Sequence, residues 1–203
     1  MGDALGYGWR GFTRNVGAFV VIALVIVGIE VVLGVVGTLL QDQFFLNVAW
    51  NLVTWLIGAL LGLGLIRAAL TVVDGGQPSA DMLFRGDGFL TYLAASILVA
   101  IGVVFGLLLC IIPGLILGFL WAFFGYSIAD GVTTDPIDAM KRSWALVSAN
   151  VGPLLLLMLA AIGINVLGAL LCLVGLLVTL PVTGVAYAYS WRLLTGGRIV
   201  PLD

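Results

Sequence analysis

The chain has 203 residues, of which 63% are hydrophobic and 9% are charged, and its formal net charge is −2. A soluble domain carries about 25% charged residues, so eight basic and ten acidic side chains cannot cover the surface of a soluble protein of this size. The composition excludes a soluble enzyme, a disordered chain and a nucleic-acid-binding protein, and it predicts an all-α integral membrane protein.

The residue types that are missing limit the chemistry. The chain has no histidine, one lysine (Lys141) and one glutamate (Glu30), which removes histidine-based acid–base catalysis, histidine metal ligands and Ser-His-Asp triads. Two cysteines are too few for a cysteine-only zinc site. We therefore expect no catalytic residue, no metal, no cofactor and no enzymatic activity. The apolar run after residue 15 is far longer than the core of a signal peptide, so we expect no cleaved leader.

Six segments are long and apolar enough to cross a bilayer, which takes about 20 residues of helix. They cover about 15–40, 47–73, 88–111, 114–131, 151–174 and 176–195. The third and fourth segments meet at Pro113 and Gly114, and the fifth and sixth meet near Gly175. Proline and glycine at these joins predict tight hairpin turns.

The basic residues predict the orientation of the spans. If the N-terminus lies in the cytoplasm, all eight fall on the cytoplasmic side and the outer loops carry none. These residues are Arg10, Arg14, Arg67, Arg85, Lys141, Arg142, Arg192 and Arg198. This distribution follows the positive-inside rule, and an odd number of spans would break it. We expect a multi-pass protein of the plasma (inner) membrane with both termini in the cytoplasm.

The chain also repeats itself, which favours a repeat architecture. The sequence W-R-G-F-T-R-N-V-G from Trp9 is similar to W-A-L-V-S-A-N-V-G from Trp144, and Asp74-Gly75 is similar to Asp130-Gly131. Three units follow, at about 2–73, 78–131 and 135–197, within one membrane domain covering 1–203. Each is a short cytoplasmic-face amphipathic helix followed by a transmembrane hairpin, so the three hairpins are predicted to be parallel repeats. The alternative is that short apolar patterns match by chance.

Two of the amphipathic helices can be described in detail. Asp135 is placed to cap a helix that starts at Pro136, and an apolar stripe follows at Ile137, Met140, Trp144 and Val147. Leu5, Trp9, Phe12 and Val16 form a similar stripe near the N-terminus. Such helices lie in the membrane interface and either anchor the spans or contact lipid or a partner. The candidate contact residues are Trp9, Arg10, Arg14, Lys141, Arg142 and Trp144.

Two polar residues lie near the middle of predicted spans. Glu30 in the first span has Asn165 in the fifth as its equivalent in the repeat. A carboxylate at this depth costs at least ~2.5 kcal/mol and usually faces the interior of the helix bundle. We predict a protonated Glu30 that is hydrogen-bonded to Asn165 or to another helix. The pair serves either as a contact between helices or as a proton- or cation-responsive group.

The two cysteines, Cys110 and Cys172, both end spans at the outer boundary of the membrane. Oxidising conditions on that side permit a disulfide between them. The alternative is that each is a free cysteine acting as a small apolar residue.

A series of motifs covers the middle of the chain: Ile112-Pro113-Gly114-Leu115-Ile116, a span, Asp130-Gly131, Pro136-Ile137-Asp138-Ala139 and Arg142-Ser143-Trp144. This series resembles a broad prokaryotic six-span membrane family. The family includes the membrane domain of glycerophosphoryl diester phosphodiesterases and related uncharacterised inner-membrane proteins. The resemblance implies an integral membrane protein of the cell envelope. It carries over no catalytic residue, because in that family the phosphodiesterase activity belongs to a separate soluble domain that we do not expect in this chain.

The sequence therefore favours a non-enzymatic membrane protein of the cell envelope that binds lipid or a partner protein. The alternative is a small transporter or channel that uses a polar site around Glu30 and Asn165. Membrane lipids are the expected partners, with a membrane protein as the other candidate and no nucleic acid. The substrate and the oligomeric state stay open.

Overall fold

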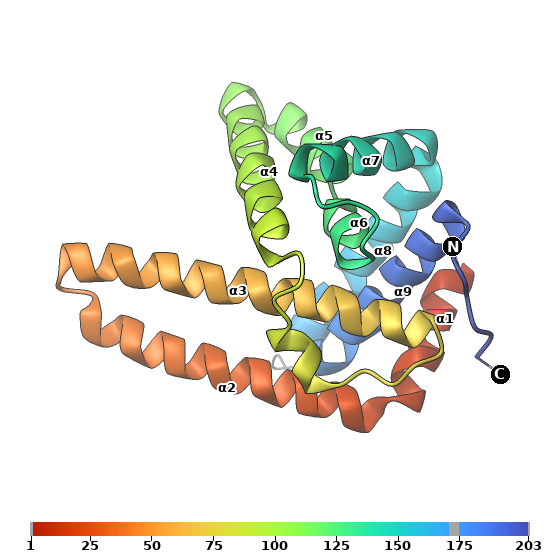
Figure 1. The fold of residues 1–203 in the computed structure, drawn as a ribbon, viewed down its shortest axis with the longest axis horizontal. Helices are drawn as coiled ribbons and strands as arrows, with labels where there is room; N and C mark the ends of the chain where they lie inside the picture. The colour runs from red at the N-terminus through yellow and green to blue at the C-terminus, as the bar shows by residue number, and fades with distance from the viewer. Residues whose placement is uncertain (1, 171–174, 203) are drawn as a thin grey trace.

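The computed structural model describes residues 2–170 and 175–202, which are mostly helical and contain no strand. In chain order the elements are α1 (Gly2–Arg14), α2 (Val16–Leu40), α3 (Phe44–Val73), the 3-10 helix η1 (Ala80–Phe84), α4 (Phe89–Leu109), α5 (Ile111–Leu120), α6 (Phe124–Ala129), α7 (Pro136–Ala149), α8 (Val151–Leu170) and α9 (Leu176–Thr195), as Figure 1 shows. The predicted spans agree closely with α2, α3, α4, α8 and α9, apart from residues 171–174 of the fifth span, which lie outside the described residues.

Five helical segments in the described part of the chain are long and apolar enough to cross a membrane. They are Val16–Leu40, Phe44–Val73, Phe89–Leu109, Ile111–Ala129 and Val151–Leu170. Most of their large apolar side chains are exposed, which is the arrangement expected where lipid is the solvent. α9 is not among the five. It carries Thr183, Ser190 and Arg192, and all but three of its residues are buried or half-buried.

α9 lies at the centre of the fold, and α1 packs along it. A Cβ on Gly8 would overlap the carbonyl oxygen of Val182, and a Cβ on Gly11 would lie 3.0 Å from side-chain atoms of Val72 and Val185. The two glycines therefore allow the helices to approach closely. One face of α1 is buried here, whereas Trp9 and Arg10 on the opposite face are exposed.

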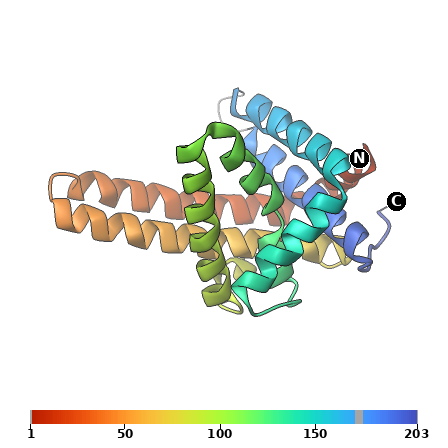
Figure 2. The same ribbon diagram turned by 90° about the horizontal axis from the view of Figure 1, so that it is seen from above.

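The hairpins do not lie parallel to one another. Figure 1 shows the α2–α3 hairpin extending to the left and the α4–α5 hairpin extending upward, and Figure 2 shows the same divergence from above. Side chains at the far end of α2–α3, such as Leu39, Phe44 and Phe45, are exposed. The prediction of three hairpin repeats that share one orientation is not confirmed, because the α2–α3 and α4–α5 hairpins point in different directions.

The predicted span 114–131 is interrupted between α5 and α6. Its backbone is a turn at residues 121–123, where the regular helical hydrogen bonds stop. The backbone N–H of Phe123 donates instead to Oγ of Ser143 at 3.0 Å, and this hydroxyl donates to the carbonyl of Leu120 at 2.8 Å. Ser143 is fully buried on α7. One side chain of the amphipathic helix therefore satisfies both sides of the interruption.

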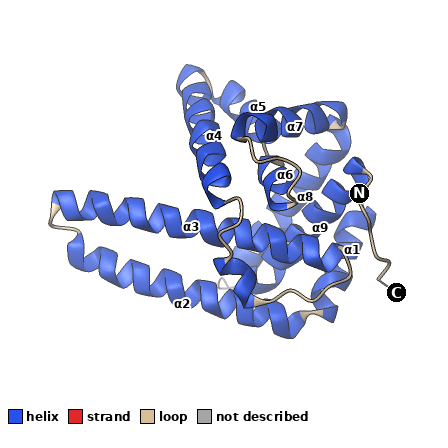
Figure 3. Cartoon of the chain, viewed as in Figure 1, coloured by secondary structure: helices blue, strands red, loops and turns tan. Residues whose placement is uncertain are grey.

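The middle unit has a shorter surface element than predicted. Figure 3 shows mostly loop between α3 and α4, with only η1 as a helical turn. Leu83 of η1 is fully buried, and its Cα lies so close to Gly64 that no side chain would fit there. Asp81 and Arg85 form an exposed ion pair at 2.7 Å. Packing on α3, rather than an amphipathic helix, holds this segment.

Candidate functional site

α7 begins as the sequence predicts. The carboxylate of Asp135 accepts a hydrogen bond of 2.9 Å from the N–H of Ile137, and Pro136 occupies the first turn. This cap satisfies one of the backbone donors that a helix start leaves open. The predicted cap of α7 is confirmed.

The face of α7 that is buried differs from the predicted apolar stripe. The buried residues are Ala139, Ser143 and Val147, whereas Ile137 and Trp144 are exposed. Small side chains let α7 approach α4, α5 and α6, and they direct the larger apolar side chains away from the protein. The exposed side of α7 is therefore available to lipid or to a partner.

A groove of about 470 Å³ runs beside α7. We call it the α7 groove; its lining residues are Leu98, Trp121, Ile137, Met140, Lys141 and Trp144. The ring centroids of Trp121 and Trp144 are 6.4 Å apart. Trp121 also covers Gly102 of α4, where an added Cβ would lie 2.6 Å from the indole. The groove combines two indoles, aliphatic walls and one ammonium group.

The two neighbouring cations beside the α7 groove differ in their pairing. Nε of Arg142 donates to Oδ2 of Asp138 at 2.6 Å, and this hydrogen bond holds the pKa of the Asp138 carboxyl below its ordinary value. Among the described residues, no ion pair involves Lys141. Lys141 therefore contributes a positive charge that Asp138 does not neutralise by direct contact. Indoles with an adjacent ammonium suit an amphipathic anion, whose chains contact the rings and whose charge meets the lysine.

A second polar cluster lies where α3, α6 and α9 end. Arg192 of α9 contacts Asp74 and Asp130 at 2.7 Å each, and Nε1 of Trp191 donates to Asp130 at 3.0 Å. The side chains of Arg192 and Asp130 are 14% and 15% exposed, and that of Asp74 is 40% exposed. This cluster lines a pocket of about 460 Å³. Its charges are paired with one another, so we assign it a structural role.

The sequence analysis did not find this pairing. The repeated Asp74-Gly75 and Asp130-Gly131 pairs and the lone Arg192 were visible, but 118 residues separate Arg192 from Asp74. The available signal was the placement of all three charges at the same end of predicted spans.

The structure does not bring Glu30 and Asn165 together. Glu30 is exposed on α2, one residue past Ile29, which lies on the packed side of the helix. The side-chain amide of Asn165 donates instead to the hydroxyl of Thr183 on α9 at 3.3 Å. The predicted hydrogen bond is wrong, because similar depth in two spans does not place two residues on facing sides. Oδ1 of Asn165 and Oγ1 of Thr179 are buried without a hydrogen-bond partner in the described residues.

The other predicted site residues are dispersed. Trp9, Arg10 and Arg14 are exposed on α1, and none of them lines the α7 groove. Cys110 is exposed at the turn between α4 and α5. The predicted disulfide stays untested, because Cys172 lies outside the described residues.

Comparison with known proteins identifies relatives without a known activity. The chain matches no family model and no solved structure. It is 36% identical over 137 residues to the uncharacterized protein Rv2560 of Mycobacterium tuberculosis strain H37Rv and, over the same length, to the uncharacterized protein Mb2590 of Mycobacterium bovis. Each match covers 68% of this chain and 42% of the relative. The chain therefore spans less than half the length of these curated relatives.

Proposed function

We propose that this protein is a non-enzymatic membrane protein that binds an anionic lipid in the α7 groove. The observation that carries the proposal is the position of Lys141 beside the indoles of Trp121 and Trp144. Tryptophan prefers the headgroup region of a bilayer, and a basic side chain there attracts anionic lipid. The apolar faces of Ile137 and Met140 give the acyl chains a surface to follow.

The proposal includes six membrane spans, with α9 as the sixth and both termini in the cytoplasm. α9 is less apolar than the other five, and seven of its 20 residues are buried against protein. The ends of α3, α6 and α9 and the start of α4 meet around one polar pocket, which is the arrangement expected of ends on one side of a bilayer.

Local features also support three repeats. α3, α6 and α9 each end beside a glycine with positive φ, namely Gly75, Gly131 and Gly196. Two of the units then continue with an acid–base pair four residues apart, Asp81 with Arg85 and Asp138 with Arg142. The six-span family that the sequence resembles is consistent with this arrangement.

The topology predicts a difference in labelling between two exposed loop positions. With both native cysteines replaced by serine, we expect a membrane-impermeant maleimide to label Asp42→Cys in intact cells. The same reagent should label Gln77→Cys only after the membrane is permeabilised, because the bilayer blocks access to the cytoplasmic side. Labelling of both positions from outside would contradict the six-span topology.

If the α7 groove binds anionic lipid, removing its one positive charge should lower the amount of lipid that the protein retains. In nanodiscs of phosphatidylcholine and phosphatidylglycerol, we expect Lys141→Ala to lower the phosphatidylglycerol retained in native mass spectra about fivefold, since one basic residue near an anionic surface contributes about 1 kcal/mol. Lys141→Arg keeps the charge and should retain the lipid.

Arg198→Ala is the matched control, because it removes an exposed cation outside the α7 groove. Equal losses of phosphatidylglycerol in Lys141→Ala and Arg198→Ala would mean that the lipid is held by general charge attraction, and would contradict a binding site in the α7 groove. Retention of a protein in place of phosphatidylglycerol would instead assign the α7 groove to a partner.

A further inference from the structure

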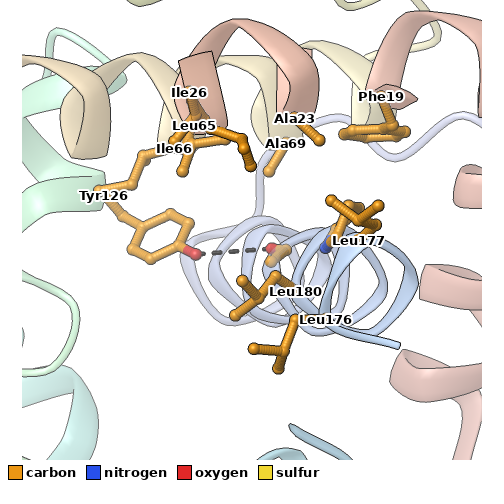
Figure 4. A pocket seen from close by; sticks show the side chains of 13 residues that line it. Phe19, Ala23, Ile26, Leu65, Ile66, Ala69, Tyr126, Leu176, Leu177 and Leu180 are labelled. Atoms are coloured by element: carbon orange, nitrogen blue, oxygen red, sulfur yellow. Dashed lines mark hydrogen bonds between the residues drawn. The ribbon is translucent and has the colours of Figure 1, made fainter. Parts of the chain in front are cut away.

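A third cavity, of about 420 Å³, lies between α2, α3, α6 and α9. We call it the inner cavity. Its lining residues are Phe19, Ala23, Ile26, Val27, Leu65, Ile66, Ala69, Tyr126, Leu176, Leu177, Leu180, Pro181 and Gly184. Figure 4 shows these side chains around the open space. No residue of the α7 groove is among them.

The lining of the inner cavity is uncharged and almost wholly apolar. The Tyr126 hydroxyl points toward α9 in Figure 4 and donates to the carbonyl of Gly184 at 3.5 Å. A buried water needs two to four polar partners, and the two polar groups named here already bond to each other. A cavity of this size falls within the range of about 300–1,000 Å³ of small-molecule sites. Its surface therefore fits a hydrocarbon better than water or an ion.

Small residues of α2, α3 and α9 keep the inner cavity open. Ala23 and Ala69 contribute only methyl groups from α2 and α3, and a Cβ added to Gly184 would meet no atom within 4 Å. Pro181 has no N–H and interrupts the hydrogen bonding of α9 at this level. A bulkier residue at position 184 would extend into the inner cavity rather than into a neighbouring helix.

The inner cavity opens onto an exposed apolar surface, which in the proposed membrane topology faces the bilayer. Three of its lining residues are exposed on that surface: Val27 at 48%, Leu65 at 40% and Leu180 at 53%. Phe19, Ala69 and Tyr126 form its buried wall. A chain that belongs to the surrounding lipid can therefore enter without leaving an apolar environment.

We propose that one hydrocarbon chain of a bilayer lipid enters between α2, α3 and α9 and occupies the inner cavity. The lipid headgroup stays outside. Dispersion contacts with the walls and the removal of an empty apolar volume favour this state. This site goes beyond the proposed function, with which it shares only the membrane location.

The test uses the full chain in nanodiscs that contain phosphatidylcholine with a diazirine on one acyl chain. After irradiation, mass spectrometry locates the crosslinks. We expect them to concentrate at Leu177 and Ala69 of the inner cavity relative to Leu159, an exposed residue of α8 that any bilayer chain can reach. Gly184→Leu should lower crosslinking at Ala69 by about tenfold, because the added side chain takes the volume that the lipid chain needs.

Gly163→Leu is the matched control, since it adds the same side chain to α8 at a site where a Cβ also meets no atom within 4 Å. It should leave crosslinking at Ala69 unchanged, and so should Lys141→Ala, which tests the α7 groove separately. If Gly184→Leu fails to fold, Ala23→Phe blocks the inner cavity from α2. Crosslinking at Ala69 that stays at the level of Leu159, or that a folded Gly184→Leu or Ala23→Phe leaves unchanged, would overturn the proposal.

Discussion

Arg192→Ala is expected to destabilise the protein by about 3 kcal/mol, because removing one partner of a buried ion pair leaves uncompensated charge. Arg192 holds Asp74 at the end of α3 and Asp130 at the end of α6, each at 2.7 Å. The Asp130 carboxylate is mostly buried and, within the described part of the chain, would keep the indole N–H of Trp191 as its one side-chain donor. Asp74 is partly exposed and loses less, since water can solvate it.

The measurement is thermal unfolding of purified protein in detergent. A loss of this size corresponds to a decrease in Tm of roughly 6–12 °C for a chain of about 200 residues. Arg198→Ala is the control, because Arg198 is an exposed arginine near the same terminus. Arg192→Lys should fall between the two, since an ammonium cannot form the paired contacts of a guanidinium with both carboxylates. A Tm for Arg192→Ala equal to that of Arg198→Ala would mean that the Arg192 cluster does not stabilise the protein.

Local signals in the sequence predicted much of the helical layout. The long apolar run that ends before Gln41 predicted α2, and Asp135 with Pro136 predicted the start of α7. These features depend on neighbouring residues alone, because the bilayer thickness fixes the length of an apolar helix and a cap acts within one turn.

The side of each helix that is packed could not be predicted in the same way. Apart from Glu30, α2 is apolar on every side, so its other residues do not show which face is packed. In water, amphipathicity would mark the buried face, but lipid removes that signal. The Glu30–Asn165 prediction failed for this reason.

Contacts between segments that are distant in the chain also could not be predicted from the sequence. Trp121, Ala122 and Phe123 continue an apolar run, and hydropathy predicts an unbroken span through them. The interruption depends on Ser143, which is 20 residues from Phe123 along the chain. Nothing in the sequence indicates that the hydroxyl of Ser143 replaces backbone hydrogen bonds between α5 and α6.

Ser143→Ala, like Arg192→Ala, is therefore expected to lower the stability of the protein strongly. The substitution leaves the N–H of Phe123 without an acceptor and the carbonyl of Leu120 without a donor. Ser143 itself is fully buried. Each orphaned polar group costs about 1–3 kcal/mol, so the two together cost about 2–6 kcal/mol. Thermal unfolding measures this loss, with Ser148→Ala as control because Ser148 is exposed and bonds only within α7.

Hydrogen exchange distinguishes this role from ordinary packing. In Ser143→Ala the amide of Phe123 should exchange faster relative to that of Leu157, which lies within α8. Trp121 lies at the interruption and Trp144 follows Ser143, so the variant should also loosen the α7 groove and lower phosphatidylglycerol retention. Lys141→Ala should lower retention without changing the exchange of Phe123, because it removes a charge and leaves the backbone contacts intact. Unchanged exchange at Phe123 in Ser143→Ala would mean that α7 docks on α5 and α6 without supporting the interruption.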